Sequence, residues 1–318
     1  MAYRDLAPVV VYTYSRLAHL QRTIEALQQN FLASRTVLYV VSDGPKHAAH
    51  KPLVDKVREY VDGVSGFREV VRVYRNKNLG TPASPIQAEK QVIYDHGTVI
   101  SMEDDNISSR NYLDFLNGGL QAYWDDPSIF SVCGYCPPIP IPSDFGCEYW
   151  FYDWNISWGF AMWKHKYDRI YPLLNDFAAF KREGLLRKVR SRGGLYITDS
   201  LMRDFKKKSI FPDAVLCTKM TRDNLRSVIP TISKIRNIGS DGSGVSGSHL
   251  AWKHDVKLDD RPLTDFGFAE TPKMNECLGE ETQKFYNSGI LTRLSRRIGI
   301  YHELSALKYW IKFNLLRQ

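Results

Sequence analysis

Short apolar runs alternate with amphipathic segments along the first third of the chain. The short runs are typical of buried strands, whereas apolar residues that recur every three or four positions are typical of helices. Strand–helix alternation of this kind predicts an α/β fold with a mostly parallel central sheet and helices on both faces. The predicted strands lie at 8–14, 37–41, 70–74 and 99–102, and the predicted helices lie at 17–27, 52–61 and 85–94.

Polar clusters follow three of the predicted strands, namely Tyr14-Ser15-Arg16, Ser42-Asp43-Gly44 and Glu103-Asp104-Asp105. Because right-handed crossovers place the carboxyl ends of parallel strands at one edge of a sheet, we expect these clusters to converge there. Consecutive carboxylates repel one another unless a cation lies between them, and carboxylate oxygens are preferred ligands of Mg²⁺ and Mn²⁺. The three acids therefore predict a divalent-metal site, although a solvated acidic turn is the simpler alternative for such a triplet taken alone.

A nucleoside diphosphate is the ligand that suits this edge of the sheet. Asp43 could recognise a base, Arg16 could bind phosphate, and the three acids could hold the metal. No Gly-x-Gly-x-x-Gly follows the first strand and the chain has no Gly-Lys-Ser/Thr loop, so dinucleotide binding and P-loop chemistry are disfavoured.

The middle of the chain predicts a helix at 111–124, a strand at 129–135 and then a segment at 147–163 that is dense in aromatic residues. These aromatic rings could form core, or some of them could stack on the faces of sugars. Gly159, directly after Trp158, would leave the backbone open to a ligand. Core packing and sugar binding remain equal alternatives for this segment.

Two later features bear on the site. A helix begins near Leu195, where Thr198 or Asp199 could cap its N-terminus. The stretch at 237–249 is rich in Gly and Ser and is too long for a simple turn. It is either a loop that closes over a ligand or an irregular connection.

Composition limits the function classes. At 318 residues and 43% apolar content, the chain is long enough for one large α/β domain, with or without an appendage. The net charge of +8 favours an anionic partner, such as a nucleotide, a phospholipid surface or a nucleic acid. There is no pattern of a signal peptide and no stretch long and apolar enough to span a bilayer, so we expect a cytoplasmic protein.

The five cysteines do not form a recognisable framework. Cys133 and Cys136 have the spacing of a redox or zinc half-site, but no second pair of cysteines or histidines follows at zinc-ligand spacing. We therefore expect reduced, partly buried thiols. The other three cysteines are scattered, at Cys147, Cys217 and Cys277.

The tail at 290–316 predicts a helix with an apolar stripe and interspersed Arg and Lys. A basic amphipathic helix that contains Trp and Tyr suits the surface of a membrane. Packing on the domain or on another subunit is the equal alternative. We therefore divide the chain into a main domain at 1–250 and a C-terminal helical extension at 251–318.

With these residues in place, the chain resembles inverting glycosyltransferases of the GT-A type. It is most similar to family 2 enzymes and to the N-acetylglucosaminyltransferase I group of family 13. The similarity extends from about Pro8 to Gly247 and lies in an ordered set of motifs. That set comprises the strand followed by Arg16, Asp43 after the second strand, Asn78-Leu79-Gly80, Glu103-Asp104-Asp105, Asp126-Pro127-Ser128 and Trp158-Gly159. The resemblance implies the GT-A fold of nucleotide-diphospho-sugar transferases, with a nucleotide-binding half at about 1–106 and an acceptor half at about 107–250.

The resemblance also implies roles for residues that match the family's motifs. Asp105 would bind the metal, Mn²⁺ or Mg²⁺, directly. Asp199 would be the general base, although the family often has two adjacent acids where this chain has Asp199 and Ser200. The nucleotide sugar would contact Thr13, Tyr14, Arg16, Asp43, Asn78, Gly80, Glu103 and Asp104, and the acceptor or sugar pocket would include Trp158, Gly159 and Asp241.

Some of these roles are more specific. Asp43 would recognise uracil or another base, and Arg16 would lie near the base or the phosphates. Glu103 and Asp104 would contact the ribose, the sugar or metal-bound water. His249 is a weaker candidate for a further metal ligand.

The implied activity is metal-dependent, inverting transfer of a hexosyl or N-acetylhexosaminyl group in polysaccharide biosynthesis. The resemblance favours a UDP-linked donor, such as UDP-GlcNAc, and a glycan or lipid-linked glycan as acceptor. The basic tail predicts that the enzyme is peripheral on the inner face of a membrane. No nucleic acid is expected as a partner. Two alternatives stay open. A sugar-nucleotide nucleotidyltransferase usually has a Gly-rich basic loop after the first strand, which this chain lacks, and a non-catalytic module would bind membranes or glycans.

Overall fold

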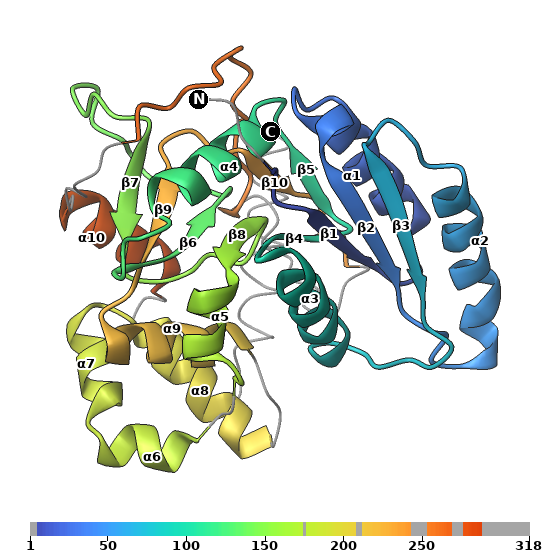
Figure 1. Cartoon of the computed structure of the whole chain (residues 1–318). Helices are drawn as coiled ribbons and strands as arrows, with labels where there is room; N and C mark the ends of the chain where they lie inside the picture. Colours follow the sequence, from blue (N-terminus) through green and yellow to red (C-terminus); the bar gives the residue numbers. More distant parts are fainter. Residues whose placement is uncertain (1–4, 174–175, 208–211, 243–252, 269–275, 288–318) are drawn as a thin grey trace, which may run out of the picture.

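The computed structural model describes residues 5–173, 176–207, 212–242, 253–268 and 276–287 (Figure 1). Its centre is an eight-stranded mixed sheet in the order β3-β2-β1-β4-β8-β6-β9-β7. The strands of this sheet are β1 (Val9–Thr13), β2 (Val37–Ser42), β3 (Glu69–Tyr74), β4 (Thr98–Glu103), β6 (Ile129–Cys133), β7 (Tyr149–Tyr152), β8 (Phe160–Trp163) and β9 (Arg226–Pro230). A second, two-stranded antiparallel sheet pairs β5 (Asn106–Ser108) with β10 (Ile235–Asn237).

Helices surround the central sheet. They are α1 (Leu17–Gln28), α2 (Lys51–Asp62), α3 (Ala83–His96), α4 (Tyr112–Ala122), α5 (Lys164–Ile170), α6 (Phe177–Arg182), α7 (Leu185–Ser191), α8 (Leu195–Lys207), α9 (Pro212–Asp223) and α10 (Glu276–Tyr286). Short 3₁₀ helices lie at Ala33–Arg35 and Ala48–His50.

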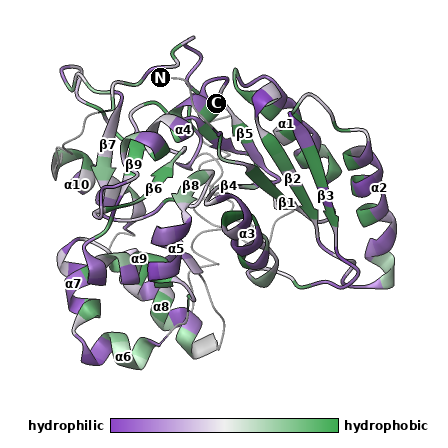
Figure 2. Ribbon diagram, in the orientation of Figure 1, coloured by the Kyte–Doolittle hydropathy of each residue, from purple (hydrophilic) through white to green (hydrophobic). Residues whose placement is uncertain are grey.

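The N-terminal strands form the interior of the first part of the sheet. Strand β1 pairs in parallel with β2 and β4, and β2 pairs in parallel with β3. Val9, Val10 and Val11 have no solvent exposure, as expected for consecutive residues of a strand that is covered on both faces. Figure 2 shows the hydrophobic residues concentrated on β1, β2 and β3.

The order of the strands positions the functional edge. The chain moves outward from β1 to β3 and then returns to place β4 on the other side of β1. Right-handed crossovers in these opposite directions put α1 and α2 on one face of the sheet and α3 on the other (Figure 1). The carboxyl ends of β1, β2, β3 and β4 therefore meet at one edge.

The predicted α/β class, the mostly parallel sheet and the helices on both faces are confirmed. Strands β7 and β8 run antiparallel to their neighbours, whereas β6 and β9 pair in parallel.

The prediction that Thr198 or Asp199 caps a helix is wrong, because α8 begins at Leu195 and both residues lie inside it. The Thr198 hydroxyl instead donates to the carbonyl of Leu195 at 3.0 Å.

The aromatic segment at 147–163 is mainly core. Its first part forms β7 and its last part forms β8, and every residue of both strands is buried. Trp150, Trp154 and Trp163 are among the most fully buried large side chains of the described chain. Only Trp158 in this segment keeps an intermediate exposure for a tryptophan, so it alone stays available for the sugar stacking considered from the sequence.

Three features of the sequence fall outside the described residues. These are the basic amphipathic tail at 290–316, most of the Gly/Ser-rich stretch after Gly242, and His249. Within the described ranges, no helix has the length and apolar character needed to cross a membrane.

Candidate active site

Arg16 links the two acids that follow β4. The residue directly precedes α1, and its Nη2 contacts Asp104 Oδ1 and lies 2.7 Å from Asp105 Oδ2. Thr13, at the end of β1, donates from Oγ1 to Asp104 Oδ2 at 3.2 Å. The sequence predicted a divalent metal ion at these carboxylates. In the structure the guanidinium of Arg16 lies between them, and metal binding remains a prediction.

Burial and charge act against each other in this cluster. Burial opposes the charge of Arg16, but Asp104 and Asp105 raise its pKa above the ordinary value. Burial also raises the pKa of Asp104, and the nearby Arg16 counteracts that rise. Each group of this pair therefore favours the charged form of the other, against the opposing effect of burial.

Asp105 is enclosed by a segment that is distant in sequence. Its Oδ1 accepts hydrogen bonds from the side-chain amides of Asn106 at 2.9 Å and Asn237 at 2.7 Å, and its carbonyl accepts from the backbone N–H of Ile238 at 2.8 Å. A side chain at Gly239 would collide with Asp105 Oδ2 and approach Arg16 Nη1 to 3.2 Å. The end of β10 therefore closes around this carboxylate, and only a glycine fits at 239.

Glu103, the last residue of β4, is separate from this ion-paired cluster. It lies beside Tyr12 in the parallel register, and its side chain reaches solvent although protein surrounds it on most sides. That surrounding protein, together with Asp105, Asp213 and Asp104, raises the pKa of Glu103 to about 8. Glu103 therefore takes up a proton near neutral pH.

Asp213 is a functional candidate that the sequence reasoning missed. It lies in the first turn of α9, and its Oδ1 accepts a hydrogen bond from Ser157 Oγ at 2.6 Å. Burial raises the pKa of Asp213, and the bond from Ser157 lowers it. The signal in the sequence was Pro212-Asp213, because Pro followed by an acid is typical of the first turn of a helix.

Glu89 is a second acid that the sequence reasoning missed. It is buried on α3, where its Oε1 accepts from Ser101 Oγ at 2.7 Å and Tyr12 Oη at 2.9 Å, and its Oε2 accepts from Tyr171 Oη at 3.5 Å. Burial raises the pKa of Glu89, and Asp213 contributes to the rise. A carboxylic acid on the buried face of a helix was the available signal.

Asp43 binds the turn that follows β3. Its carboxylate accepts hydrogen bonds from the backbone N–H of Leu79 at 3.0 Å and Gly80 at 2.8 Å, and from Asn78 Nδ2 at 3.1 Å. It is 5% exposed. The structure therefore brings Asp43, Asn78 and Gly80 together in an arrangement where Asp43 organises the turn. Base recognition by Asp43 remains a prediction.

Tyr14 points toward the loop after β2. Its hydroxyl lies 2.6 Å from His50 Nδ1 and accepts a hydrogen bond from the backbone N–H of Lys46 at 2.9 Å. Tyr14 therefore contacts the loop after β2, whereas Thr13 contacts Asp104.

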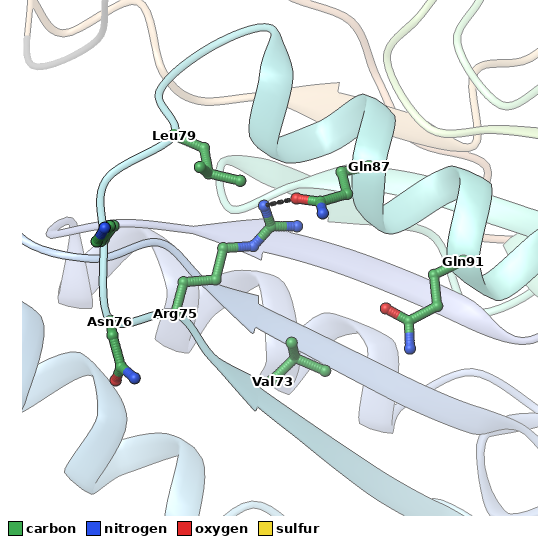
Figure 3. A pocket seen from close by; sticks show the side chains of 7 residues that line it. Val73, Arg75, Asn76, Leu79, Gln87 and Gln91 are labelled. Atoms are coloured by element: carbon green, nitrogen blue, oxygen red, sulfur yellow. Dashed lines mark hydrogen bonds between the residues drawn. The ribbon is translucent and has the colours of Figure 1, made fainter.

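A groove of about 430 Å³ lies beside the turn that Asp43 holds. Figure 3 shows it between the end of β3 and the exposed side of α3, where Arg75 Nη1 donates to Gln87 Oε1 at 2.6 Å. Five of its seven lining side chains are polar or basic, and the other two are a valine and an exposed leucine. The lining consists of Val73, Arg75, Asn76, Lys77, Leu79, Gln87 and Gln91.

The remaining predicted residues lie on other elements. Asp199 is exposed on α8, and among the described residues no hydrogen bond or ion pair joins it to the three acids. Asp241 Oδ2 lies 3.1 Å from His19 Nε2 on α1. Both assignments remain predictions. Asp241 follows β10 and contacts α1, the helix that Arg16 precedes.

Trp158 and Gly159 face packed neighbours. The Trp158 ring makes an edge contact with Tyr135 at 4.8 Å between centroids. Gly159 has a left-handed φ of +63°, and a side chain there would meet Ile235 Cγ1 and Tyr112 Oη at 2.8 Å. Packing is a sufficient reason for glycine at this position, so open backbone at Gly159 is not needed to explain it.

Comparisons with known proteins give weak similarities. No family model and no curated protein matches the chain. Among solved structures, the chain is similar to the mannosyltransferase PcManGT from Pyrobaculum calidifontis in complex with GDP-Man and Mn²⁺, with 12% identity, a TM-score of 0.39 and coverage of 70% of each chain. It is also similar to S. aureus TarS 1–349, with 12% identity, a TM-score of 0.40 and coverage of 72% of this chain and 59% of that one. A longer S. aureus TarS structure gives 10% identity, a TM-score of 0.41 and coverage of 74% and 37%.

Proposed function

We propose that this chain is a metal-dependent, inverting glycosyltransferase of the GT-A type that uses a nucleoside-diphosphate sugar. The observation that carries the proposal is the convergence of Asp104 and Asp105 on one cationic nitrogen of Arg16, at the carboxyl edge of the sheet. Ligands of open α/β sheets bind at this edge. The turn held by Asp43 lies after the neighbouring strands and supports binding of the nucleoside.

A divalent metal fits these residues. Asp104 and Asp105 already direct one oxygen each at a shared cation, and Mg²⁺ is usually held by one or two carboxylates together with substrate phosphates. In the described part of the chain, no three His, Cys, Asp or Glu side chains gather into a metal site. Bound there, Mn²⁺ or Mg²⁺ would neutralise the charge that develops on the departing nucleoside diphosphate.

The transfer needs one base on the acceptor side. A carboxylate accepts the proton of the acceptor hydroxyl while the hydroxyl oxygen bonds to the anomeric carbon and the bond to the diphosphate breaks. The resemblance assigns this base to Asp199, and its exposure on α8 leaves it accessible to an acceptor. A positioned base contributes roughly 10²- to 10⁴-fold to the rate.

The substrates follow from the resemblance and the charge of the chain. The donor is a UDP-linked sugar, and the acceptor is a glycan or lipid-linked glycan. Trp158 and Asp241 belong to the acceptor or sugar pocket.

The basic tail at 290–316 docks the enzyme on an anionic membrane. Liposome flotation of the full chain, compared with that of a chain truncated before Ile290, tests this docking. Equal flotation of the two chains would contradict the docking.

A panel of sugar nucleotides tests the function. With MnCl₂ present, one sugar nucleotide should raise the melting temperature of the full chain and should be slowly hydrolysed. Asp105→Ala should lose the metal-dependent part of the stabilisation. Asp199→Asn should keep the binding of the donor and lose turnover. Exposed Asp144→Asn is the matched control and should behave like the original chain.

Three outcomes would contradict parts of the proposal. Stabilisation without hydrolysis of any donor would indicate a binding module. Release of pyrophosphate from a nucleoside triphosphate would indicate a nucleotidyltransferase. Normal turnover in Asp199→Asn would leave the transferase intact and remove Asp199 as its base, in which case Asp213→Asn is the next variant to measure.

A further inference from the structure

Asp105 has one carboxylate oxygen left for a cation. Its Oδ1 already accepts hydrogen bonds from two side-chain amides, those of Asn106 and Asn237. An amide N–H and a metal ion do not share the same lone pairs without weakening each other, because both seek the electron density of the oxygen. A cation therefore binds most readily at Oδ2.

Arg16 already holds that oxygen. Its Nη2 lies 2.7 Å from Asp105 Oδ2 and also contacts Asp104 Oδ1, while its Nη1 faces the backbone at Gly239. The guanidinium is about one fifth exposed, so it is not locked in the interior. A metal ion on Oδ2 would meet a positive charge at close range, and this repulsion is strong in a site that water reaches poorly.

We propose that Arg16 is an internal counter-ion that a divalent metal must displace from Asp105, and that it then binds the diphosphate of the donor. The inference rests on the proposed function and extends it to the order of binding. Without donor, Arg16 competes with the metal. With donor, the phosphates give the guanidinium a new anionic partner, since a planar guanidinium matches phosphate oxygens well. Metal and nucleotide therefore bind cooperatively, and each raises the affinity for the other by the same factor.

The decisive experiment measures Mn²⁺ binding without any donor. Arg16→Gln removes the competing charge and should bind Mn²⁺ about tenfold or more tightly than the original chain. Electron paramagnetic resonance of the free Mn²⁺ measures both affinities. The same variant should bind UDP more weakly in saturating Mn²⁺, because the diphosphate loses its guanidinium partner. Opposite signs for the two ligands distinguish this role from simple damage to the site.

Two controls complete the experiment. Arg187→Gln removes an exposed arginine of α7 and should change neither affinity. Arg16→Lys keeps a positive charge and should keep the weak binding of Mn²⁺. In the original chain, UDP should raise the affinity for Mn²⁺ about tenfold or more, and this measurement does not depend on any variant folding.

The outcomes separate the two proposals. Equal or weaker Mn²⁺ binding by folded Arg16→Gln would overturn the counter-ion role, as would equal Mn²⁺ affinity of the original chain with and without UDP. Neither result would affect the proposed transferase if the original chain still hydrolyses a sugar nucleotide. Failure of the original chain to bind Mn²⁺ and every sugar nucleotide of the panel would overturn both proposals.

Discussion

The backbone N–H of Gly80 donates to Asp43 Oδ2 at 2.8 Å, and this bond ties the turn after β3 to the end of β2. Leu79 donates its N–H to the same carboxylate at 3.0 Å. A buried carboxylate that accepts several N–H groups fixes the position of the chain that carries them. Leu79 of this turn also lines the groove of Figure 3, so the rigidity of the turn matters to the shape of the groove.

Replacement of Asp43 tests this relationship. Asp43→Asn keeps the size of the side chain but removes its charge and turns an amide toward the N–H groups of Leu79 and Gly80. We expect a loss of about 1–3 kcal/mol in the free energy of unfolding, since buried donors lose a charged acceptor. Urea unfolding measures this loss, with Asp144→Asn as the exposed control. Equal stability of the two variants would contradict the role of Asp43 in holding the turn.

Lys234 and Asp259 form a second buried relationship. Lys234 is fully buried, donates from Nζ to Asp259 Oδ2, and lies 4.7 Å from the centroid of Phe266. Asp259 also accepts from Arg261 Nε at 2.8 Å. Burial lowers the pKa of Lys234, while Asp259 raises it. The pair fastens the segment at 253–268 to the main body.

We expect Lys234→Met to lower the free energy of unfolding by about 3–5 kcal/mol, because Asp259 would keep a buried charge with fewer partners. Lys257 and Asp260 form the matched control, since that pair is 3.7 Å apart and largely exposed. Lys257→Met should cost about 1 kcal/mol or less. Chemical denaturation measures both variants. Similar losses for the two lysines would show that burial of the first pair has no energetic consequence.

Gly159 gives a prediction with an internal control. Gly159→Ala would place a methyl group 2.8 Å from Ile235 Cγ1 and Tyr112 Oη, at a φ of +63°. We expect a loss of about 2–4 kcal/mol from overpacking and left-handed strain together. Gly184 has a φ of +72° with nothing within 4 Å of the added methyl, so Gly184→Ala should cost only the strain, about 1–2 kcal/mol. Thermal unfolding of the two variants gives the difference, and equal losses would argue against close packing at Gly159.

The sequence predicted the sheet, and the convergence of polar residues at its edge, because both depend on local pattern. Apolar runs such as Val9–Val11 have one stable environment, which is burial on both faces of a sheet. Polar residues directly after those runs must then lie at the edge. Arg16, Asp104 and Asp105 were predicted to converge for this reason, and they do.

The missed parts of the site depend on contacts between distant segments. Asn237 reaches Asp105 only because β10 pairs with β5, and a three-residue strand gives almost no signal in the sequence. Glu89 and Asp213 carry only weak signals in the sequence, namely the apolar face of α3 and Pro212 at the start of α9. Their proximity to each other depends on how these two helices pack. Arg16 was expected to face a ligand, and its pairing with the acids requires the three-dimensional register of β1 beside β4.

His254 makes the stability of the chain depend on pH. Its ring lies 5.4 Å from Trp158 and 5.2 Å from Phe285 of α10, between centroids. Burial, and then the charge of Lys253, lowers the pKa of His254 to about 4. The unfolded chain has the ordinary value of about 6.5, so the unfolded state binds the proton first as the pH falls. The contribution of neutral His254 is therefore complete above pH 6.5 and is lost progressively between pH 6.5 and 4.

The original chain and His254→Gln should consequently converge in acid. Between pH 7.5 and pH 5, the difference in free energy of unfolding should shrink by about 2 kcal/mol, since each pH unit within this window is worth about 1.4 kcal/mol. Urea unfolding at the two pH values measures it, and exposed His47→Gln is the control that should show no such change. Because the ring joins Trp158 to α10, the loss should appear first as loosening of this helix, which hydrogen exchange detects. A difference that stays constant with pH would mean that His254 titrates normally in the folded chain, and would contradict its burial between the two aromatic groups.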